Sequence, residues 1–305
     1  QGGDNEKLIF KILKRGDKLN LETASGENDL VDSGLRYDLT LPLSRYYANN
    51  AANLPSPFKA LQMGSVWRAD RPQKGRFRQF VQCDIDILGD PTSLAEIELI
   101  LATTAALSKI CPDNAFTVRI NDREILKGMA LYCGFPEDSM DQVFITLDKM
   151  DKIGLEGVEK ELLESGYQKE CVDKYLDMLK NVTRNADGVR ALGQKLADVM
   201  PLEVSRNLAH IMDTVTEVSE ADFGLEFDPT LVRGMSYYTG TIFEVSMEGF
   251  GGSVAGGGRY DKMIGKFTGM ETPACGFSIG FERIVTILMD NGFKVPGAGE
   301  KKAYL

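Results

Sequence analysis

The chain has 305 residues, 43% of them hydrophobic and 26% charged, a composition typical of a globular protein with enough apolar mass for a sizeable core. Its 45 acidic and 35 basic residues give a net charge of −10, which argues against general nucleic-acid binding but not against a local basic patch. No apolar run of about 18 residues predicts a membrane span, the first residues do not resemble a signal peptide, and the length suits one large domain with or without an insertion.

The cysteines and the single histidine exclude several chemistries. The five cysteines are scattered and odd in number, which favours reduced thiols and an intracellular protein. His210 is the only histidine, lies in the helical segment SRNLAHIMDTV and has no evident partner, so we interpret it as a structural residue. Because there is no C-x-x-C pair either, we expect neither a zinc site nor acid–base catalysis by histidine.

Residues 35–50 predict a strand that leads into a helix beginning near Pro42. Residues 58–70 and 76–89 alternate between apolar and polar side chains, the second segment strictly. With the turn residues PQKG between them, these two segments predict a long β-hairpin with a charged loop.

Residues 93–110 predict a helix, with Ser93 as its N-cap and Glu96 as the partner in a capping box. Residues 116–122 predict a strand. A further helix should follow that strand and stop at Gly134, since glycine readily adopts the left-handed conformation of a helix end.

The second half of the chain changes character. Residues 147–212 are rich in lysine and glutamate and predict a helical insertion. Strands should resume over residues 223–247, followed by a glycine-dense turn at 249–258, where six of ten residues are glycine. Residues 274–292 predict a buried strand that runs into an apolar helix.

The predicted hairpin loop concentrates positive charge. Between Arg68 and Arg78 there are four arginines and one lysine against a single aspartate. Arginine binds phosphate oxygens with two parallel hydrogen bonds, and an aromatic ring such as Phe80 can stack on a base. The alternative, given equal weight by composition alone, is a solvated surface loop with incidental charge.

The second hairpin arm carries a polar row. Alternation places Gln82, Asp84 and Asp86 on one face and the cysteine and isoleucines between them on the other. Such a row suits recognition of a small polar ligand, for example an ammonium or imidazole group. The alternative is a half-exposed strand whose polar face meets solvent.

Two further arginines stand in apolar or glycine-rich settings, Arg233 in LVRGMSYYTG and Arg283 in GFERI. The glycine-rich stretch near them is neither a dinucleotide-binding fingerprint nor a P-loop. Because no catalytic histidine, cysteine or serine motif accompanies the arginines, they predict an enzyme that positions a polyphosphate and neutralises developing charge without supplying a nucleophile.

Four segments together resemble the histidyl-tRNA synthetase family of class II aminoacyl-tRNA synthetases: GLRYDLTLPLSRYYA, MGSVWRADRPQKGRFRQFVQCDIDILG, LVRGMSYYTGTIFEV, and GSVAGGGRYDKMIGKF with ACGFSIGFERI. The resemblance implies an α+β fold built on an antiparallel sheet flanked by helices. It divides the chain into a catalytic domain (1–146 and 213–305) and a helical insertion domain (147–212). The family's motif 1 is expected before residue 1, and its anticodon-binding domain beyond Leu305.

The resemblance also implies an activity: ATP-dependent activation of L-histidine to histidyl-adenylate, followed by transfer to tRNA(His). The substrate carboxylate attacks the α-phosphate of ATP, so the enzyme needs arginines, Mg²⁺ and correct orientation. A homodimer is expected for the full-length protein, in the cytoplasm or, for an organellar copy, the mitochondrion, and no membrane partner is expected.

Carried over by motif position, the resemblance assigns a role to each site residue. The catalytic residues are Arg68, Arg233 and Arg283. The ATP-binding residues are Arg68, Arg76, Phe80 and Arg283. The histidine-binding residues are Asp38, Thr40, Gln82, Asp86, Arg233, Tyr237, Tyr238 and Tyr260. The tRNA acceptor end is assigned to Gln73 and Lys74, and no protein metal site is assigned.

Two non-catalytic readings remain open beside the enzyme. One is a relative that regulates ATP phosphoribosyltransferase or serves as the sensor domain of a translation-factor kinase, and the other is an interaction scaffold that only retains the fold. Such relatives typically lose some of the ATP-handling arginines. The presence of Arg68, Arg233 and Arg283 favours the enzyme.

Overall fold

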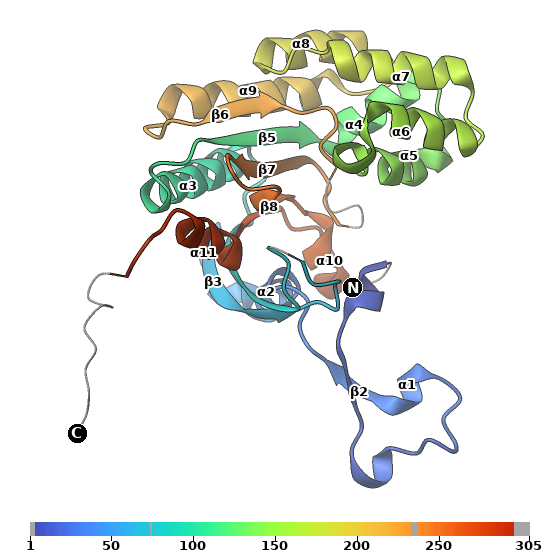
Figure 1. The fold of residues 1–305 in the computed structure, drawn as a ribbon, viewed down its shortest axis with the longest axis vertical. Coiled ribbons are helices and arrows are strands. Elements are labelled where there is room, and N and C mark those ends of the chain that lie inside the picture. Colours follow the sequence, from blue (N-terminus) through green and yellow to red (C-terminus); the bar gives the residue numbers. More distant parts are fainter. Residues whose placement is uncertain (1–3, 74, 233–236, 296–305) are drawn as a thin grey trace.

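The computed structural model describes residues 4–73, 75–232 and 237–295 (Figure 1). Within these residues the main sheet has seven strands in the order β3-β4-β9-β8-β7-β5-β6. All neighbours are antiparallel except β5 and β6, which pair in parallel at one edge. The strands are β3 (Phe58–Trp67), β4 (Gln79–Leu88), β5 (Phe116–Asp122), β6 (Gly224–Phe227), β7 (Thr241–Met247), β8 (Ser253–Arg259) and β9 (Ala274–Gly280).

The predicted hairpin is confirmed by the pairing of β3 with β4, which runs without a register break from Phe58 opposite Leu88 to Trp67 opposite Gln79. The strand β4 begins at Gln79, so Phe77 belongs to the loop and not, as predicted, to the alternating arm. β3 and β4 therefore form a regular two-stranded ribbon at one edge of the main sheet, and the loop that joins them carries the basic cluster.

The N-terminal segment forms an arm that projects from the body of the molecule (Figure 1). Its two strands pair antiparallel as a separate small sheet. The elements of the arm are η1 (Asp4–Leu8), β1 (Lys11–Leu13), η2 (Gly16–Lys18), α1 (Glu27–Leu30) and β2 (Val31–Gly34).

The strand predicted from residue 35 is wrong. The ladder ends at Gly34, and the chain crosses the end of β3 through single hydrogen bonds, with the Trp67 amide donating to the Arg36 carbonyl. The Asp38 side chain then accepts a hydrogen bond from the Leu41 amide and starts α2 (Thr40–Asn50). A residue that caps a helix cannot at the same time continue a strand ladder.

Helices cover both faces of the sheet. A small apolar cluster joins α2 and α10 (Lys262–Thr268) to the face of β4 and β9 that carries Leu88 and Ala274. The opposite face of β4, with Ile87, packs into the main core together with α3 (Leu94–Ile110) and α11 (Phe281–Asp290).

The capping box predicted for α3 is wrong. The Ser93 side chain makes no capping hydrogen bond, and the Leu94 amide donates to Thr92 Oγ1 instead. Glu96 is almost fully buried and binds Arg259 on β8 with both carboxylate oxygens. A capping box stabilises a helix by satisfying backbone N–H groups at its first turn. A buried arginine without its carboxylate partner destabilises the fold by much more, so Glu96 pairs with Arg259 instead of capping the helix.

The middle of the chain is helical from Arg123 to Val218, and the helix predicted to stop at Gly134 does so, with Gly134 in the left-handed conformation. The segment predicted as a helical insertion is helical, and its last helix continues past residue 212. These helices gather at one end of the molecule (Figure 1). They are α4 (Arg123–Cys133), η4 (Glu137–Ser139), α5 (Met140–Leu147), α6 (Met150–Glu164), α7 (Lys169–Asn181), α8 (Ala186–Lys195) and α9 (Leu202–Val218). Outside this group, the short helix η3 (Ala51–Asn53) follows α2.

The glycine-dense segment is only partly the predicted turn. Gly256, Gly257 and Gly258 lie in β8, inside the sheet. A methyl group at Gly257 would lie 1.9 Å from the Gly276 carbonyl oxygen, so the close approach of the two strands requires glycine there.

Among the described residues, none of the helices is both long and apolar enough to cross a bilayer.

Candidate active site

Even-numbered residues of β4 form a buried polar row on the face covered by α2 and α10. The exposed fractions of Gln82, Asp84 and Asp86 are 8%, 3% and 3%. Arg68 and Phe80 belong to the same face by the antiparallel register, in which Phe80 lies opposite Val66. The predicted alternation is therefore confirmed, and the alternative in which this polar face meets solvent is wrong.

The polar row leaves hydrogen-bonding atoms without protein partners. Gln82 Oε1, Asp84 Oδ1 and Asp86 Oδ2 are buried and accept no hydrogen bond within the described structure. Gln82 uses its amide nitrogen to donate to Ser278 Oγ at 3.1 Å. Buried acceptors without donors are unfavourable, so three of them on one strand face indicate a site completed by a ligand that donates hydrogen bonds.

The carboxyl groups of Asp84 and Asp86 have raised pKa values. Burial raises the pKa of Asp86 to about 7, and the hydrogen bond from Tyr260 lowers it while Asp84 and Asp38 raise it. Burial also raises the pKa of Asp84 to about 6, against the hydroxyl of Ser278 and the charge of Arg68, which lower it. A cationic ligand would reverse both shifts, which is the electrostatic signature of a binding site for positive charge.

The neighbouring strand β9 has only glycine or serine at the positions opposite the polar row. On β9, Gly280, Ser278 and Gly276 lie opposite Gln82, Asp84 and Asp86 respectively. A methyl group at residue 276 would lie 2.0 Å from Asp86 Oδ1. The Asp86 carboxylate therefore occupies space that only glycine at position 276 leaves open.

Three tyrosines gather at the Asp86 end of the row. The Tyr260 hydroxyl is buried and donates to Asp86 Oδ1 at 2.6 Å. The ring of Tyr237 lies 4.4 Å from that of Tyr238 and 6.4 Å from that of Tyr260, measured between centroids. The predicted histidine-binding residues Asp86, Tyr237, Tyr238 and Tyr260 are thus brought together, with aromatic rings beside a carboxylate.

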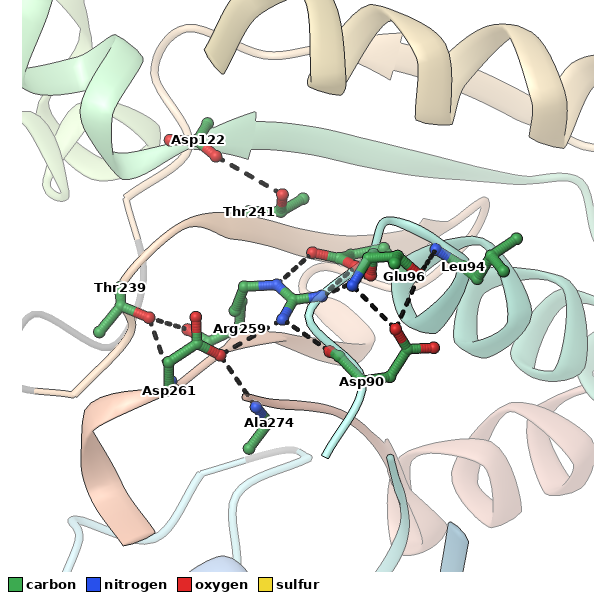
Figure 2. Close-up of polar contacts among 10 residues, drawn as sticks. Asp90, Leu94, Glu96, Asp122, Thr239, Thr241, Arg259, Asp261 and Ala274 are labelled. Carbon is green, nitrogen blue, oxygen red and sulfur yellow. Dashed lines mark hydrogen bonds and ion pairs between the residues drawn. The ribbon is translucent and has the colours of Figure 1, made fainter. Parts of the chain in front are cut away.

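Arg259, which precedes Tyr260 in the chain, makes an ion pair with Glu96 on α3 (Figure 2). Arg259 donates to Glu96 through Nε and one terminal nitrogen, both at 2.6 Å, and its other terminal nitrogen reaches Asp261 at 3.3 Å. Asp261 in turn accepts from the Ala274 amide, while the Tyr260 amide donates to the Ala274 carbonyl. The end of β8 is therefore tied to α3 and β9 on both sides of Tyr260.

Arg68 occupies the other end of the row. Its guanidinium lies 4.2 Å from the centre of the Tyr37 ring and 5.0 Å from that of Phe80. Arg68 Nε donates to the Tyr37 carbonyl oxygen at 3.1 Å. Cation–π contacts and one hydrogen bond thus orient a guanidinium beside the predicted adenine-stacking ring, as the basic-cluster interpretation requires.

Arg283 lies in the first turn of α11, next to Gly280 of β9. A methyl group at Gly280 would lie 3.1 Å from its Cδ. Its guanidinium donates to the carbonyl of Gly75 at 3.2 Å and to the hydroxyl and carbonyl oxygens of Ser253. These contacts connect the hairpin loop to β8 through Arg283.

Of the predicted α-amino ligands Asp38, Thr40 and Gln82, the first two lie at the start of α2 and the third lies in the polar row. Burial raises the pKa of Asp38, while the Leu41 amide and Arg68 lower it. The influence of Arg68 places the Asp38 carboxylate in the electrostatic neighbourhood of the polar row, while its Oδ1 accepts the hydrogen bond that caps the helix.

The remaining predicted residues lie at the loop or outside the described structure. Gln73 and Arg76 are exposed and exchange two backbone hydrogen bonds in a tight turn. Lys74 and Arg233 are not among the described residues, so their predicted roles stay predictions.

Sequence reasoning missed several residues of this site. Glu282 accepts a hydrogen bond from the Val81 amide at 2.7 Å, which fixes α11 to β4. Ser278 and Tyr37 contact the polar row and Arg68. The pairing of β9 with β4 brings Ser278 to the row, and the path of residues 35–39 brings Tyr37 to Arg68. No local sequence pattern predicts that pairing or that path.

Near this network, Asp122 predicts a pH effect on stability. Its carboxylate caps α4 by accepting from the Glu124 amide at 2.8 Å, and it also faces Thr241 (Figure 2). Burial raises its pKa to about 7; the hydrogen bond from the Glu124 amide lowers it, and the carboxylates of Glu124 and Glu96 raise it. Because the folded pKa lies above the unfolded one, the folded state holds the proton more tightly, and stability falls as pH rises from about 4 to about 7.

We therefore expect Asp122→Asn, which keeps the capping oxygen and removes the charge, to be more stable than the parent protein at pH 8 by about 2–4 kcal/mol. At pH 4.5 the advantage should largely vanish. Urea unfolding of both proteins at the two pH values measures the difference, and an unchanged difference between them would contradict the buried-charge account.

Comparison with known proteins agrees with this geometry. The sequence model described as Histidyl-tRNA synthetase matches residues 27–284. A histidine--tRNA ligase of Leifsonia xyli is 46% identical over 94% of this chain and 68% of its own length. A probable histidine--tRNA ligase of Tropheryma whipplei is 42% identical over 95% of this chain and 69% of its own length.

Solved structures show the same fold. The crystal structure of histidyl-tRNA synthetase from Nostoc aligns with a TM-score of 0.71 and 29% identity, over 89% of this chain and 63% of that one. A Bacillus halodurans protein described as an ATP phosphoribosyltransferase regulatory subunit/histidyl-tRNA synthetase has a TM-score of 0.70 and 24% identity. The chain thus spans about two thirds of the length of its relatives, and by sequence and fold together it belongs to the histidyl-tRNA synthetase family.

Proposed function

We propose that the chain is the catalytic region of a class II ligase that activates L-histidine with ATP and transfers it to tRNA(His). The observation that carries the proposal is the buried row of Gln82, Asp84 and Asp86, which has three acceptors without a partner among the described residues and a cation–π-stacked arginine at its other end. A positively charged or hydrogen-bond-donating small molecule completes the first part, and a phosphate or carboxylate completes the second.

Histidine fits this arrangement from end to end. Its imidazole would lie at Asp86 and Tyr260, among the tyrosine rings, and its carboxylate would point toward Arg68. The carboxylate oxygen attacks the α-phosphorus of ATP, and the bond to pyrophosphate breaks. Arg68 stabilises the charge that develops, and the chain supplies orientation instead of a nucleophile.

ATP would lie between Phe80 and Arg283. The guanidinium of Arg68 beside Phe80 orders the ring on which adenine stacks, and Arg283 stands at the positively polarised N-terminus of α11, where anions are favoured. Mg²⁺ would arrive with the triphosphate, because this ion keeps several waters and is bound mostly through substrate phosphates. It neutralises phosphate charge when bound.

For the nucleic-acid partner, we propose that the exposed turn contacts the tRNA acceptor end through Gln73, while Arg76 of the same turn lies toward the phosphates of ATP. The predicted insertion domain, residues 147–212, would hold the acceptor arm, and the full-length protein would act as a homodimer in the cytoplasm. The relatives named histidine--tRNA ligase support the enzyme over a regulatory subunit, because they share 46% and 42% identity with this chain.

The deciding experiment is histidine-dependent ATP–pyrophosphate exchange by the full-length protein. We expect label to enter ATP only when histidine is present. Absence of exchange, with the protein folded and histidine bound, would favour the regulatory or sensor alternative.

The position of Asp86 yields a specificity prediction. We expect Asp86→Ala to raise the KM for histidine by about 10–100-fold, because a charge-assisted hydrogen bond to the imidazole is lost, while the KM for ATP changes little. Tyr260→Phe, which keeps the ring and releases the carboxylate, serves as the matched variant and should have a smaller effect. An equal loss of ATP affinity in Asp86→Ala would show that the imidazole role is wrong.

A further inference from the structure

The site holds three carboxylates, Asp38, Asp84 and Asp86, and the resemblance assigns substrate contacts only to the first and the last. Asp86 accepts the Tyr260 hydroxyl, and Asp38 accepts the Leu41 amide that starts α2. Asp84 stands between Gln82 and Asp86, and its carboxyl group is hydrogen-bonded to the Ser278 hydroxyl on β9. Its Oδ1 is buried and accepts no hydrogen bond within the described structure.

A structural role alone does not explain Asp84. It is 3% exposed, its pair on β9 is Ser278, and the nearest residues of its row are themselves polar. A buried carboxylate with a partnerless oxygen is unfavourable for folding, and a neutral side chain of similar size would avoid that cost. Residues that lower stability in this way are found at binding sites, where the ligand supplies the missing partner.

The place of Asp84 along the strand identifies the ligand group. Arg68 and Phe80 lie toward one end of the row, and Asp86 with Tyr260 lies at the other. Since a strand rises about 3.4 Å per residue, the Asp84 backbone lies about 7 Å from that of Asp86. Histidine carries its ammonium group on the carbon between its carboxylate and its side chain, so a molecule lying along the row presents that ammonium in the middle.

We propose that Asp84 binds the α-ammonium group of the amino-acid substrate and that this contact makes the site select for a charged amine. The inference rests on the proposed function and adds a residue to it. The ammonium donates three hydrogen bonds, and Asp84 Oδ1 and Gln82 Oε1 are neighbouring acceptors on the same face that have no partner in the described part of the chain. Asp86 is then left for the imidazole.

The test compares ligands that differ at the amine. Isothermal titration of the full-length protein with histidine, with histidinol and with imidazole-lactate, in which a hydroxyl replaces the amine, measures binding without requiring catalysis. In Asp84→Asn we expect histidine and histidinol to bind about 10–100-fold more weakly, while imidazole-lactate binds within about twofold of its affinity for the parent protein. The affinity for ATP should not change.

Asp187→Asn is the control, because it makes the same chemical change on a side chain that is 88% exposed on α8. If Asp84→Asn does not fold, Asp84→Ala serves in its place, and thermal unfolding of each variant verifies the fold. Equal weakening of all three ligands would overturn the proposal in favour of an imidazole contact or a shape effect. No weakening of any ligand would overturn it in favour of a structural carboxylate.

Failure of the proposed function gives a different result. In that case the parent protein itself neither binds histidine nor exchanges pyrophosphate. The Asp84 proposal fails separately when the parent protein does both and the variant keeps its preference for the amine.

Discussion

Replacement of Arg68 by alanine is expected to lower kcat/KM in ATP–pyrophosphate exchange by about 10³-fold. The guanidinium is held between the rings of Tyr37 and Phe80, with Nε bound to the Tyr37 carbonyl. A donor fixed in this way needs no reorganisation when negative charge develops on the α-phosphate, so its contribution is largest in the transition state. Histidine binding measured by titration should fall much less than the exchange rate.

One further variant separates charge from geometry at this position, and a variant on α9 serves as the control. Arg68→Lys keeps the charge but loses the planar fork and the ring contacts, and should recover only a small part of the rate. Arg206→Ala removes an exposed arginine of α9 and should leave exchange unchanged. Equal losses in binding and rate for Arg68→Ala would mean that Arg68 only holds the ground-state substrates.

Truncation of the Arg259–Glu96 pair is expected to give the largest loss of stability. Glu96→Ala should lower the free energy of unfolding by about 3–5 kcal/mol, because it removes the two-oxygen partner of the buried Arg259 guanidinium and leaves only the longer contact with Asp261. The side chains are 11% and 1% exposed for Arg259 and Glu96. Urea unfolding of the variant and the parent protein measures the difference.

A double-mutant cycle sharpens this prediction. Removing both partners should cost less than the sum of the two single changes, since no unpaired charge then remains. The surface pair Lys160 and Glu164, whose side chains are 77% and 66% exposed, is the matched control, and Glu164→Ala should stay within about 0.5 kcal/mol. A loss of similar size at both pairs would contradict the burial argument.

Where local pattern and tertiary contact agree, the sequence predicts the structure well. The alternation of β4 correctly places Gln82, Asp84 and Asp86 on one face, because a strand has a period of two whatever covers it. The stop at Gly134 is equally local, since the helix end itself requires a left-handed residue there.

Where a residue serves a distant partner, local reasoning fails. Glu96 has the spacing of a capping box, yet it binds Arg259, which lies 163 positions further along the chain. The glycines of β8 have the composition of a turn, yet they allow β8 and β9 to approach closely. Asp38 ends the predicted strand because its side chain caps α2.

The sequence by itself thus determined the hairpin, its polar row, the helical middle of the chain and the family, since each depends on periodicity or on motif spacing. Only the tertiary structure decided that the polar row is buried, that Gly276 leaves room for the Asp86 carboxylate, and that Tyr260 and Ser278 converge on the row. Burial and register come from the pairing of β4 with β9, strands separated by 185 residues between Leu88 and Ala274. Partnerless acceptors such as Asp84 Oδ1 become visible only after that pairing has removed water from the row.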